Sequence, residues 1–168
     1  EAQEEEEDAE RALAAKSGAF RAIEARGSIG LAEVARALPP DSALVGYVRY
    51  GRMGTPGDKA KGPAAFLDKI PSYLALVLSP GRSEPTLVSV GAERDVDAKV
   101  RAWRREVSAV PQGLAQAGNR AEARYRQAGE ALRRMVWDPV AKHLKGAHRV
   151  FVVPDGAMSL VSLATLPM

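Results

Sequence analysis

The sequence predicts an α/β protein, from its strand-forming stretches, its amphipathic helices and one late apolar run. Three stretches rich in strand-forming residues follow one another without a helix between them: residues 43–52, 73–78 and 86–90. Two long helical patterns come next, and residues 150–153 then form a continuous β-branched and aromatic run. Such a run is typical of a strand buried on both faces, and Pro154-Asp155-Gly156 ends it with a turn. We expect residues 150–153 to be the first central strand of the sheet.

Two helices are expected ahead of the strands. Residues 1–25 contain strong helix formers, with Leu13, Phe20 and Ile23 at roughly helical spacing, and Gly27 ends this segment. Ser28 can cap a second helix that runs to Leu38 and stops before Pro39-Pro40. The apolar stripe expected on this second helix consists of Ile29, Leu31, Val34, Ala35 and Leu38.

The three strand-forming stretches predict an antiparallel meander, because no helix separates them. A loop rich in glycine and proline is expected over residues 51–72, between the first two strands. Residues 79–83 predict the turn between the second and third strands.

The two long helices follow the meander. Asp95 is a candidate cap for the first, whose apolar face is formed by Val96, Val100, Trp103 and Val107. Pro111-Gln-Gly113 breaks the pattern, and Asn119 with Glu122 resembles a capping box for the second helix. That helix continues to Trp137, after which Pro139 either kinks it or begins it anew before Gly146.

Composition excludes several kinds of site. The chain contains no cysteine, so these 168 residues form no disulfide, thiolate metal site or cysteine nucleophile. Residues 1–10 hold seven acids and no base, so the other residues carry 24 bases against 14 acids, a net charge of +10. No aromatic interleaving or zinc-ligand spacing accompanies these bases, so we do not expect nucleic-acid binding. The acidic start and the short apolar runs predict a cytoplasmic protein without a membrane span.

The end of the chain is crowded with apolar residues. Met158, Leu160, Val161, Leu163 and Leu166 lie within a short segment that needs more protein to cover it than follows. The chain is therefore expected to be a piece of a longer polypeptide. Expressed alone, it should aggregate or expose apolar surface.

An ordered set of blocks resembles the CHAT domain, the caspase-like domain usually found behind tetratricopeptide repeats in bacteria. The blocks are residues 38–50, 73–78, 88–91, 132–139, 152–156 and 160–166. Ser162 is a departure, since the family often has proline there. The resemblance implies that residues 28–168 form the amino-terminal portion of such a domain. Residues 1–27 would be the helical connection from upstream repeats.

The resemblance implies a cysteine endopeptidase whose His and Cys dyad lies after Met168, beyond this chain. His143 and His148 are not followed by the family's histidine motif, so no catalytic role is assigned to either. The implied partners are the rest of the same domain, the upstream repeats and a protein substrate. The alternative is a non-catalytic interaction or sensor-output module. Neither hypothesis predicts a catalytic, cofactor-binding or metal-binding residue within the chain.

Other candidate residues favour structural roles. Asp155 could place a carboxylate at the carboxyl end of a central strand, but a plain turn is favoured. The arginine-rich faces of residues 95–107 and 119–137 could bind phosphate, although solvated helix faces are favoured. Ser159 and Ser162 have neither a nucleophile-elbow motif nor a matching base.

Overall fold

The structure is a computed structural model that describes residues 10, 18, 27, 29–54, 69–109, 118–144 and 146–167. Of the helix expected over residues 1–25, only residues 10 and 18 are described, and both are helical. The break expected at Pro111-Gln-Gly113 lies outside the described part of the chain. The described helices are α3 (Leu31–Ala37), α4 (Glu93–Ala109), α5 (Gly118–Val136) and α6 (Asp138–Ala141). The strands are β1 (Ser42–Met53), β2 (Lys69–Leu78), β3 (Thr86–Ala92) and β4 (Arg149–Val153), and the short 3-10 helices η3 (Gly156–Leu160) and η4 (Leu163–Thr165) follow.

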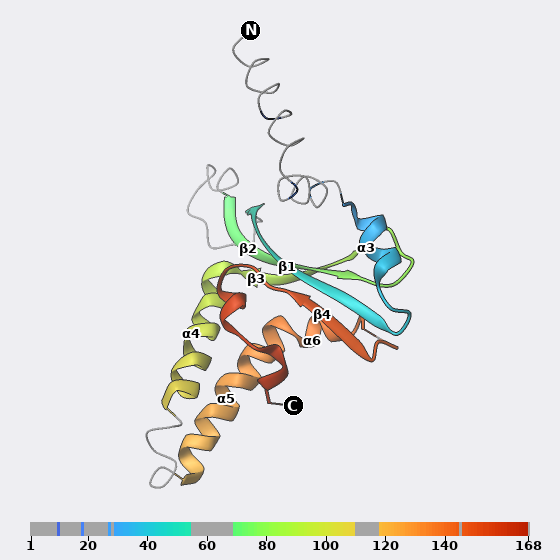
Figure 1. The fold of residues 1–168 in the computed structure, drawn as a ribbon. Helices are drawn as coiled ribbons and strands as arrows, with labels where there is room; N and C mark the ends of the chain where they lie inside the picture. Colours follow the sequence, from blue (N-terminus) through green and yellow to red (C-terminus); the bar gives the residue numbers. More distant parts are fainter. Residues whose placement is uncertain are drawn as a thin grey trace.

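The four strands form one mixed sheet in the order β3-β2-β1-β4 (Figure 1). The antiparallel meander is confirmed, since β2 pairs antiparallel with both β1 and β3. After the long helices the chain returns to the other side of β1, where β4 pairs parallel to it, with Ala43 opposite Val150. The fold is therefore α/β, as the sequence predicts.

Helices α4, α5 and α6 lie against one face of the sheet (Figure 1). Side chains alternate between the two faces along a strand, so Val45 and Tyr47 of β1 and Ala75 and Val77 of β2 point to this helical side. They pack in one core with residues that the helices and η3 contribute: Val96, Val100, Trp103, Leu132, Val136, Val140 and Met158. Burying these apolar side chains is the main force that holds helices and sheet together.

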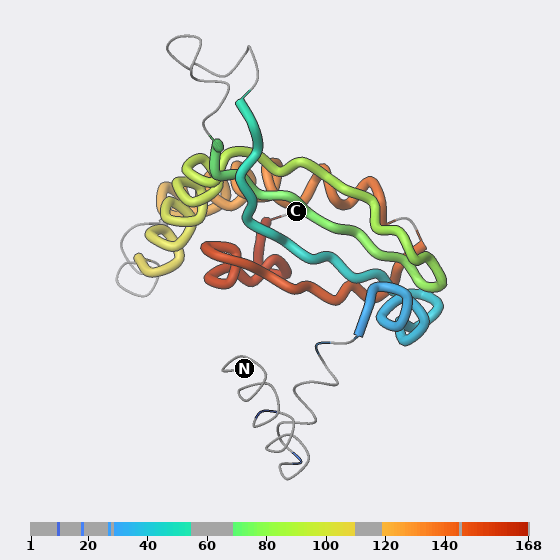
Figure 2. Tube along the Cα trace, turned by 90° about the horizontal axis from the view of Figure 1, so that it is seen from above, coloured from blue at the N-terminus to red at the C-terminus, as the bar shows by residue number. Residues whose placement is uncertain are grey.

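The opposite face of the sheet is apolar and largely bare. The register places Leu44 of β1 beside Phe151 of β4, and Leu76 of β2 beside Leu87 of β3. Phe151 is 40% exposed and Leu87 is 61% exposed. Among the described helices only α3 lies near this face, at the end where β1 begins (Figure 2). A sheet that contains a parallel pair normally has both faces covered, whereas the described residues place only α3 near this face.

A strand at residues 150–153 is confirmed, but the described residues do not bury it on both faces. In the part of the chain that the structure describes, β4 is an edge strand, because only β1 pairs with it. Val153 is 53% exposed, and Phe151 and Val152 are also exposed. The sequence pattern is that of a central strand, whereas the described sheet ends at this strand.

Several helix boundaries also differ from those expected. Helix α3 is preceded by Gly30 rather than Ser28, because the Glu33 carboxylate accepts a hydrogen bond from the Gly30 N–H at 3.0 Å. Ile29 and Leu31 of the expected stripe are exposed, and only Ala35 of α3 is buried.

Both long helices begin before the residue predicted to cap them, and a separate short helix contains Pro139. Asp95 lies in the first turn of α4, which begins at Glu93, so it is not the cap. Asn119 lies inside α5, which begins at Gly118. Pro139 does not kink α5 but lies in the first turn of α6, where a missing N–H costs nothing.

Candidate functional site

The turn that follows β4 is tied to β1 through the carboxylate of Asp155. The Arg49 backbone N–H donates a hydrogen bond to Asp155 Oδ2 at 2.9 Å, and Arg49 Nε lies 3.6 Å from Asp155 Oδ1. The ladder between β1 and β4 ends at the pair Gly46 and Val153, while β1 continues to Met53. The Asp155 side chain therefore gives β1 a hydrogen-bond acceptor beyond the point where β4 ends.

These contacts keep Asp155 in its ionised form. The hydrogen bond from the Arg49 backbone N–H holds the pKa of the Asp155 carboxyl below its ordinary value. Burial opposes this hydrogen bond with a smaller effect, and the Gly156 N–H and the Arg49 guanidinium lower the pKa further. A carboxylate with a lowered pKa and a cationic partner is a poor general base, because it is reluctant to accept a proton.

Arg49 also joins the turn to helix α4. Its guanidinium lies 3.3 Å from Glu93 Oε1, and Glu93 is the first residue of α4. One arginine on β1 therefore contacts carboxylates from two other elements. Both ion pairs are partly exposed, so their contribution is to orientation more than to stability.

Tyr73 of β2 completes this polar cluster from the buried side. Its hydroxyl accepts a hydrogen bond from the Ala157 N–H at 2.9 Å and donates one to Asp97 Oδ1 at 3.4 Å. Burial of the ring raises the pKa of Tyr73 above its ordinary value, so the hydroxyl keeps the proton that it donates. The turn is thus held by β1, β2 and α4 together.

Gly156 is required at the centre of this turn. Its φ is +55°, a backbone conformation that side-chain-bearing residues rarely adopt. A Cβ at this position would also collide with the Tyr73 hydroxyl and would lie 2.7 Å from Arg49 Cδ. The conformation and the close packing both exclude a larger residue, so the Asp-Gly pair is explained by structure.

The nucleophiles and bases considered from the sequence do not assemble around Asp155. His143 follows α6 and His148 precedes β4, and both are exposed. Ser159 and Ser162 are also exposed, and no described base is hydrogen-bonded to either hydroxyl. Within the described ranges, no group of three or more His, Cys, Asp or Glu side chains could hold a metal ion. The turn has the chemistry of a structural clamp.

The two arginine-rich helices differ in how their arginines are paired. On α5, four arginines are ion-paired with nearby carboxylates: Arg124 with Glu106, Arg126 with Glu122, Arg133 with Asp138 and Arg134 with Glu130. The favoured interpretation of a solvated face fits the exposed arginines of α4, whereas most arginines of α5 are paired.

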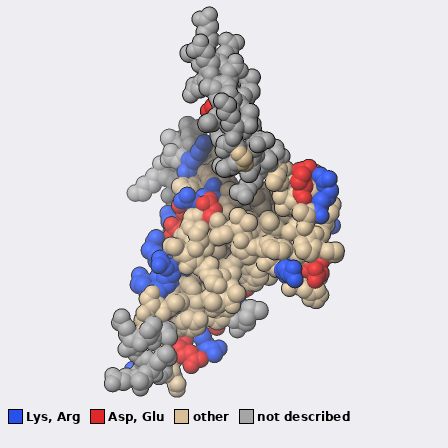
Figure 3. Space-filling view, in the orientation of Figure 1, with Lys and Arg blue, Asp and Glu red and all other residues tan. Residues whose placement is uncertain are grey.

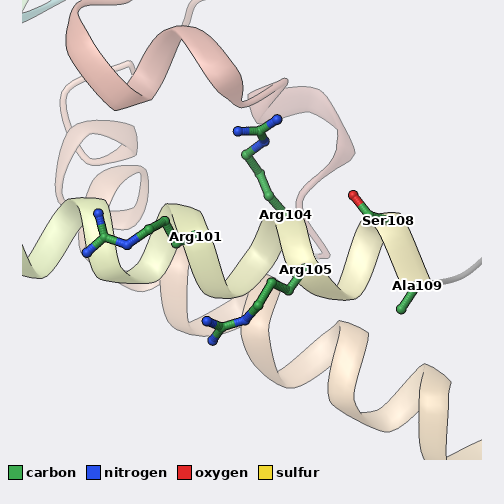
Figure 4. Close-up of a pocket in the computed structure, with 5 residues that line it drawn as sticks. All are labelled: Arg101, Arg104, Arg105, Ser108 and Ala109. Atoms are coloured by element: carbon green, nitrogen blue, oxygen red, sulfur yellow. The ribbon is translucent and has the colours of Figure 1, made fainter.

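On α4, Arg101, Arg104 and Arg105 line an open groove of about 530 Å³ together with Ser108 and Ala109 (Figure 4). None of the three arginines is ion-paired within the described ranges, and all three are exposed. The donors along this open groove are cationic, so a ligand suited to it would be an anion.

The sequence pointed to Asp155 and to the arginine-rich faces of both helices, but it did not point to Arg49 and Tyr73, which hold the turn that contains Asp155. Arg49 and Tyr73 lie in strands with a largely apolar pattern, and a charged residue within such a strand is the signal that could have identified Arg49.

Comparisons with protein-family models, with curated proteins and with solved structures gave no match to this chain. In the part of the chain that is described, no helix is long and apolar enough to cross a bilayer.

Proposed function

We propose that this chain is the scaffolding, amino-terminal part of a bacterial caspase-like (CHAT) cysteine endopeptidase. The dyad histidine and cysteine would be supplied by residues that follow Met168. The proposal includes a cytoplasmic location and tetratricopeptide repeats upstream. The chain itself holds no cysteine, so its own role is to provide the sheet and helices against which catalytic strands pack.

The observation that carries this proposal is the outer edge of β4. No described strand pairs with it, and after the exposed Arg149 at its first position its exposed side chains are the apolar Phe151, Val152 and Val153. Proteins that keep such an edge exposed usually protect it with a charge, a proline or a bulge, and residues 150–153 contain none of these. An edge that runs parallel to β1 and is apolar over most of its length is suited to receive a further strand. A caspase-like domain would continue its sheet here.

The bare face of the sheet supports the same proposal. Leu44, Leu87 and Phe151 lie on the side away from α4, α5 and α6. A two-sided α/β sheet needs helices there, and the proposed downstream part would supply both the strands at the edge and the helices over this face.

The alternative is a non-catalytic interaction module with the same fold. Asp155, the carboxylate at the carboxyl end of β4, is held by Arg49 and is unsuited to proton transfer. This observation fits a domain whose described part acts by binding. In this alternative, the β4 edge would receive a strand from a partner protein.

Protease assays on the longer polypeptide separate the two functions. The chain of 168 residues alone should cleave nothing, since a thiolate nucleophile is missing. The longer polypeptide should cleave peptides, and replacing its dyad cysteine with alanine should abolish cleavage while the melting temperature stays unchanged. Cleavage that survives this replacement, or cleavage by the present chain alone, would refute the peptidase mechanism. A longer polypeptide without a His and Cys pair would favour the interaction module.

A further inference from the structure

The carboxylates of helix α4 have hydrogen-bond or ion-pair partners, whereas three of its arginines have none among the described residues. Each of its four carboxylates has one: Glu93 contacts Arg49, Asp95 contacts Arg94, Asp97 accepts from Tyr73, and Glu106 contacts Arg124. Arg101, Arg104 and Arg105 have no such partner among the described residues. The helix therefore presents three guanidinium groups that no described carboxylate contacts.

These three arginines lie along one exposed side of α4. Their spacing of three and four residues places them on neighbouring turns, and Ser108 continues the row on the next turn. Figure 3 shows Lys and Arg gathered on the flank of the molecule where α4 lies. In Figure 4 the guanidinium groups of Arg101 and Arg105 lie apart from each other, and that of Arg104 points in a different direction. They are spread along the helix and do not converge on one point.

This arrangement selects one class of anion over others. A single phosphate is best held by donors that converge, whereas separate guanidinium groups along an open groove suit a chain that carries several negative charges. Single-stranded nucleic acid would need aromatic rings for base stacking. The aromatic residue of this helix, Trp103, is buried against Tyr125 with ring centroids 4.5 Å apart, so it is not available for stacking.

We propose that the groove lined by Arg101, Arg104, Arg105 and Ser108 is a docking site for an acidic peptide segment of a protein partner. Arginine pairs with carboxylates through two parallel N–H donors, and the Ser108 hydroxyl adds a neutral donor at the end of the row. The site lies on the helical layer, on a different surface from the β4 edge, so it does not depend on the proposed peptidase function.

The test is a binding titration of the full chain with a fluorescein-labelled octaglutamate peptide, followed by fluorescence anisotropy at physiological salt. Each protein is also made with the seven acids of residues 1–10 changed to the corresponding amides, so that its own acidic segment cannot compete. The variant R101Q/R104Q/R105Q should weaken binding by about tenfold or more, because charge-assisted contacts are lost. The matched control R36Q/R126Q/R134Q removes the same charge from arginines that are already paired on α3 and α5, and binding should stay within about twofold of the parent.

Three outcomes would overturn the proposal. The first is an absence of peptide binding by the parent chain in either version. The second is an equal loss of binding in both triple variants, which would show attraction to net charge alone. The third is tighter binding of a mixed-sequence single-stranded oligonucleotide that is lost in R101Q/R104Q/R105Q, which would make the groove a nucleic-acid site. Circular dichroism and melting curves establish that both triple variants are folded.

Discussion

Asp155 Oδ2 accepts a hydrogen bond of 2.9 Å from the backbone N–H of Arg49, although the two residues are 106 positions apart in the chain. This contact fixes the turn after β4 to the strand at the centre of the sheet. Because β4 is short and lies at the edge of the described sheet, the contact also limits where the chain can go after Val153.

The first prediction concerns the pH dependence of this contact. The folded-state pKa of Asp155 is lowered, so the carboxylate stabilises the fold above its unfolded pKa of about 4, and this contribution is lost as the pH falls through the folded pKa. Asp155→Asn should therefore lower the denaturation midpoint at neutral pH, and the difference from the parent should vanish in acid. Urea denaturation between pH 2 and pH 7 measures it.

Glu84 provides a matched carboxylate, since it is exposed and no described residue contacts its side chain. Glu84→Gln removes the same charge without removing a hydrogen bond to β1. A loss in Glu84→Gln equal to that in Asp155→Asn would mean that net charge, rather than the contact with Arg49, is responsible.

The second prediction separates the backbone requirement at Gly156 from its packing. Gly156→Ala places an alanine in a left-handed backbone conformation, which lowers the free energy of unfolding by about 1–2 kcal/mol. The added Cβ also forces the side chains of Tyr73 and Arg49 to move. Gly81 has a similar φ of +70° but nothing within 4 Å of an added Cβ, so Gly81→Ala should show the backbone cost alone. Chemical denaturation should find Gly156→Ala less stable than Gly81→Ala by at least about 1 kcal/mol. Equal losses would contradict the packing of Tyr73 against this turn.

The third prediction uses Tyr47, which is buried beneath the helices. Its hydroxyl donates a hydrogen bond to the Val136 carbonyl at 2.8 Å, and Tyr47→Phe should cost about 1–2 kcal/mol at neutral pH. Burial raises the pKa of Tyr47 well above its ordinary value, so the folded state holds this proton when the unfolded state has lost it. Stability should therefore fall above pH 10 by up to about 1.4 kcal/mol per pH unit from this group.

In Tyr47→Phe this contribution to the alkaline loss of stability should be absent. Tyr50→Phe is the control, because Tyr50 is 36% exposed and no described residue hydrogen-bonds to its hydroxyl. An unchanged alkaline slope in Tyr47→Phe would show that the hydroxyl is not buried as described.

The fourth prediction sets helix propensity against packing at Gly129. Alanine is the better helix former by about 1 kcal/mol, so Gly129→Ala in an exposed helix would stabilise it. Here an added Cβ would lie 2.6 Å from a ring atom of Trp103 and 2.7 Å from Pro167 Cγ, so we expect a net loss of about 1–3 kcal/mol. At Gly46 an added Cβ meets only Leu76 Cβ at 4.0 Å, so Gly46→Ala should be tolerated. Stabilisation by Gly129→Ala would show that Trp103 and Pro167 do not pack there.

The fifth prediction concerns the bare face and the edge beside it. The chain alone should bind the dye ANS and self-associate at micromolar concentration, because Leu87 and Val153 are exposed on this face. Leu87→Lys combined with Val153→Lys should reduce both effects, as a charge does on natural edge strands. Val107→Lys, at an exposed apolar position on α4, should change them little. A parent chain that stays monomeric and binds no dye would contradict the expectation of an incomplete layer.

Among the described residues, the sequence alone was sufficient for the order of the four strands and the two long helices. Strand-forming residues in β1, β2 and β3 and the apolar spacing of Val96, Val100 and Trp103 in α4 are local signals. The turn at Asp155 and Gly156 was likewise recognisable, because a glycine that follows a turn-forming acid marks a positive φ. Boundaries such as the start of α3 after Gly30 were missed, since the side chain of Glu33 substitutes for a conventional cap.

Only the tertiary structure decided where β4 lies and what its turn contacts. The apolar run of residues 150–153 has the composition of a central strand, and composition cannot report how many neighbours a strand has. The pairing of Asp155 with Arg49 and that of Arg124 with Glu106 depend on contacts between residues distant in the chain. The other ion pairs of α5 join residues that are close in sequence. Periodicity describes which face of an element is apolar, whereas the partner of that face is set by the packing of the whole chain.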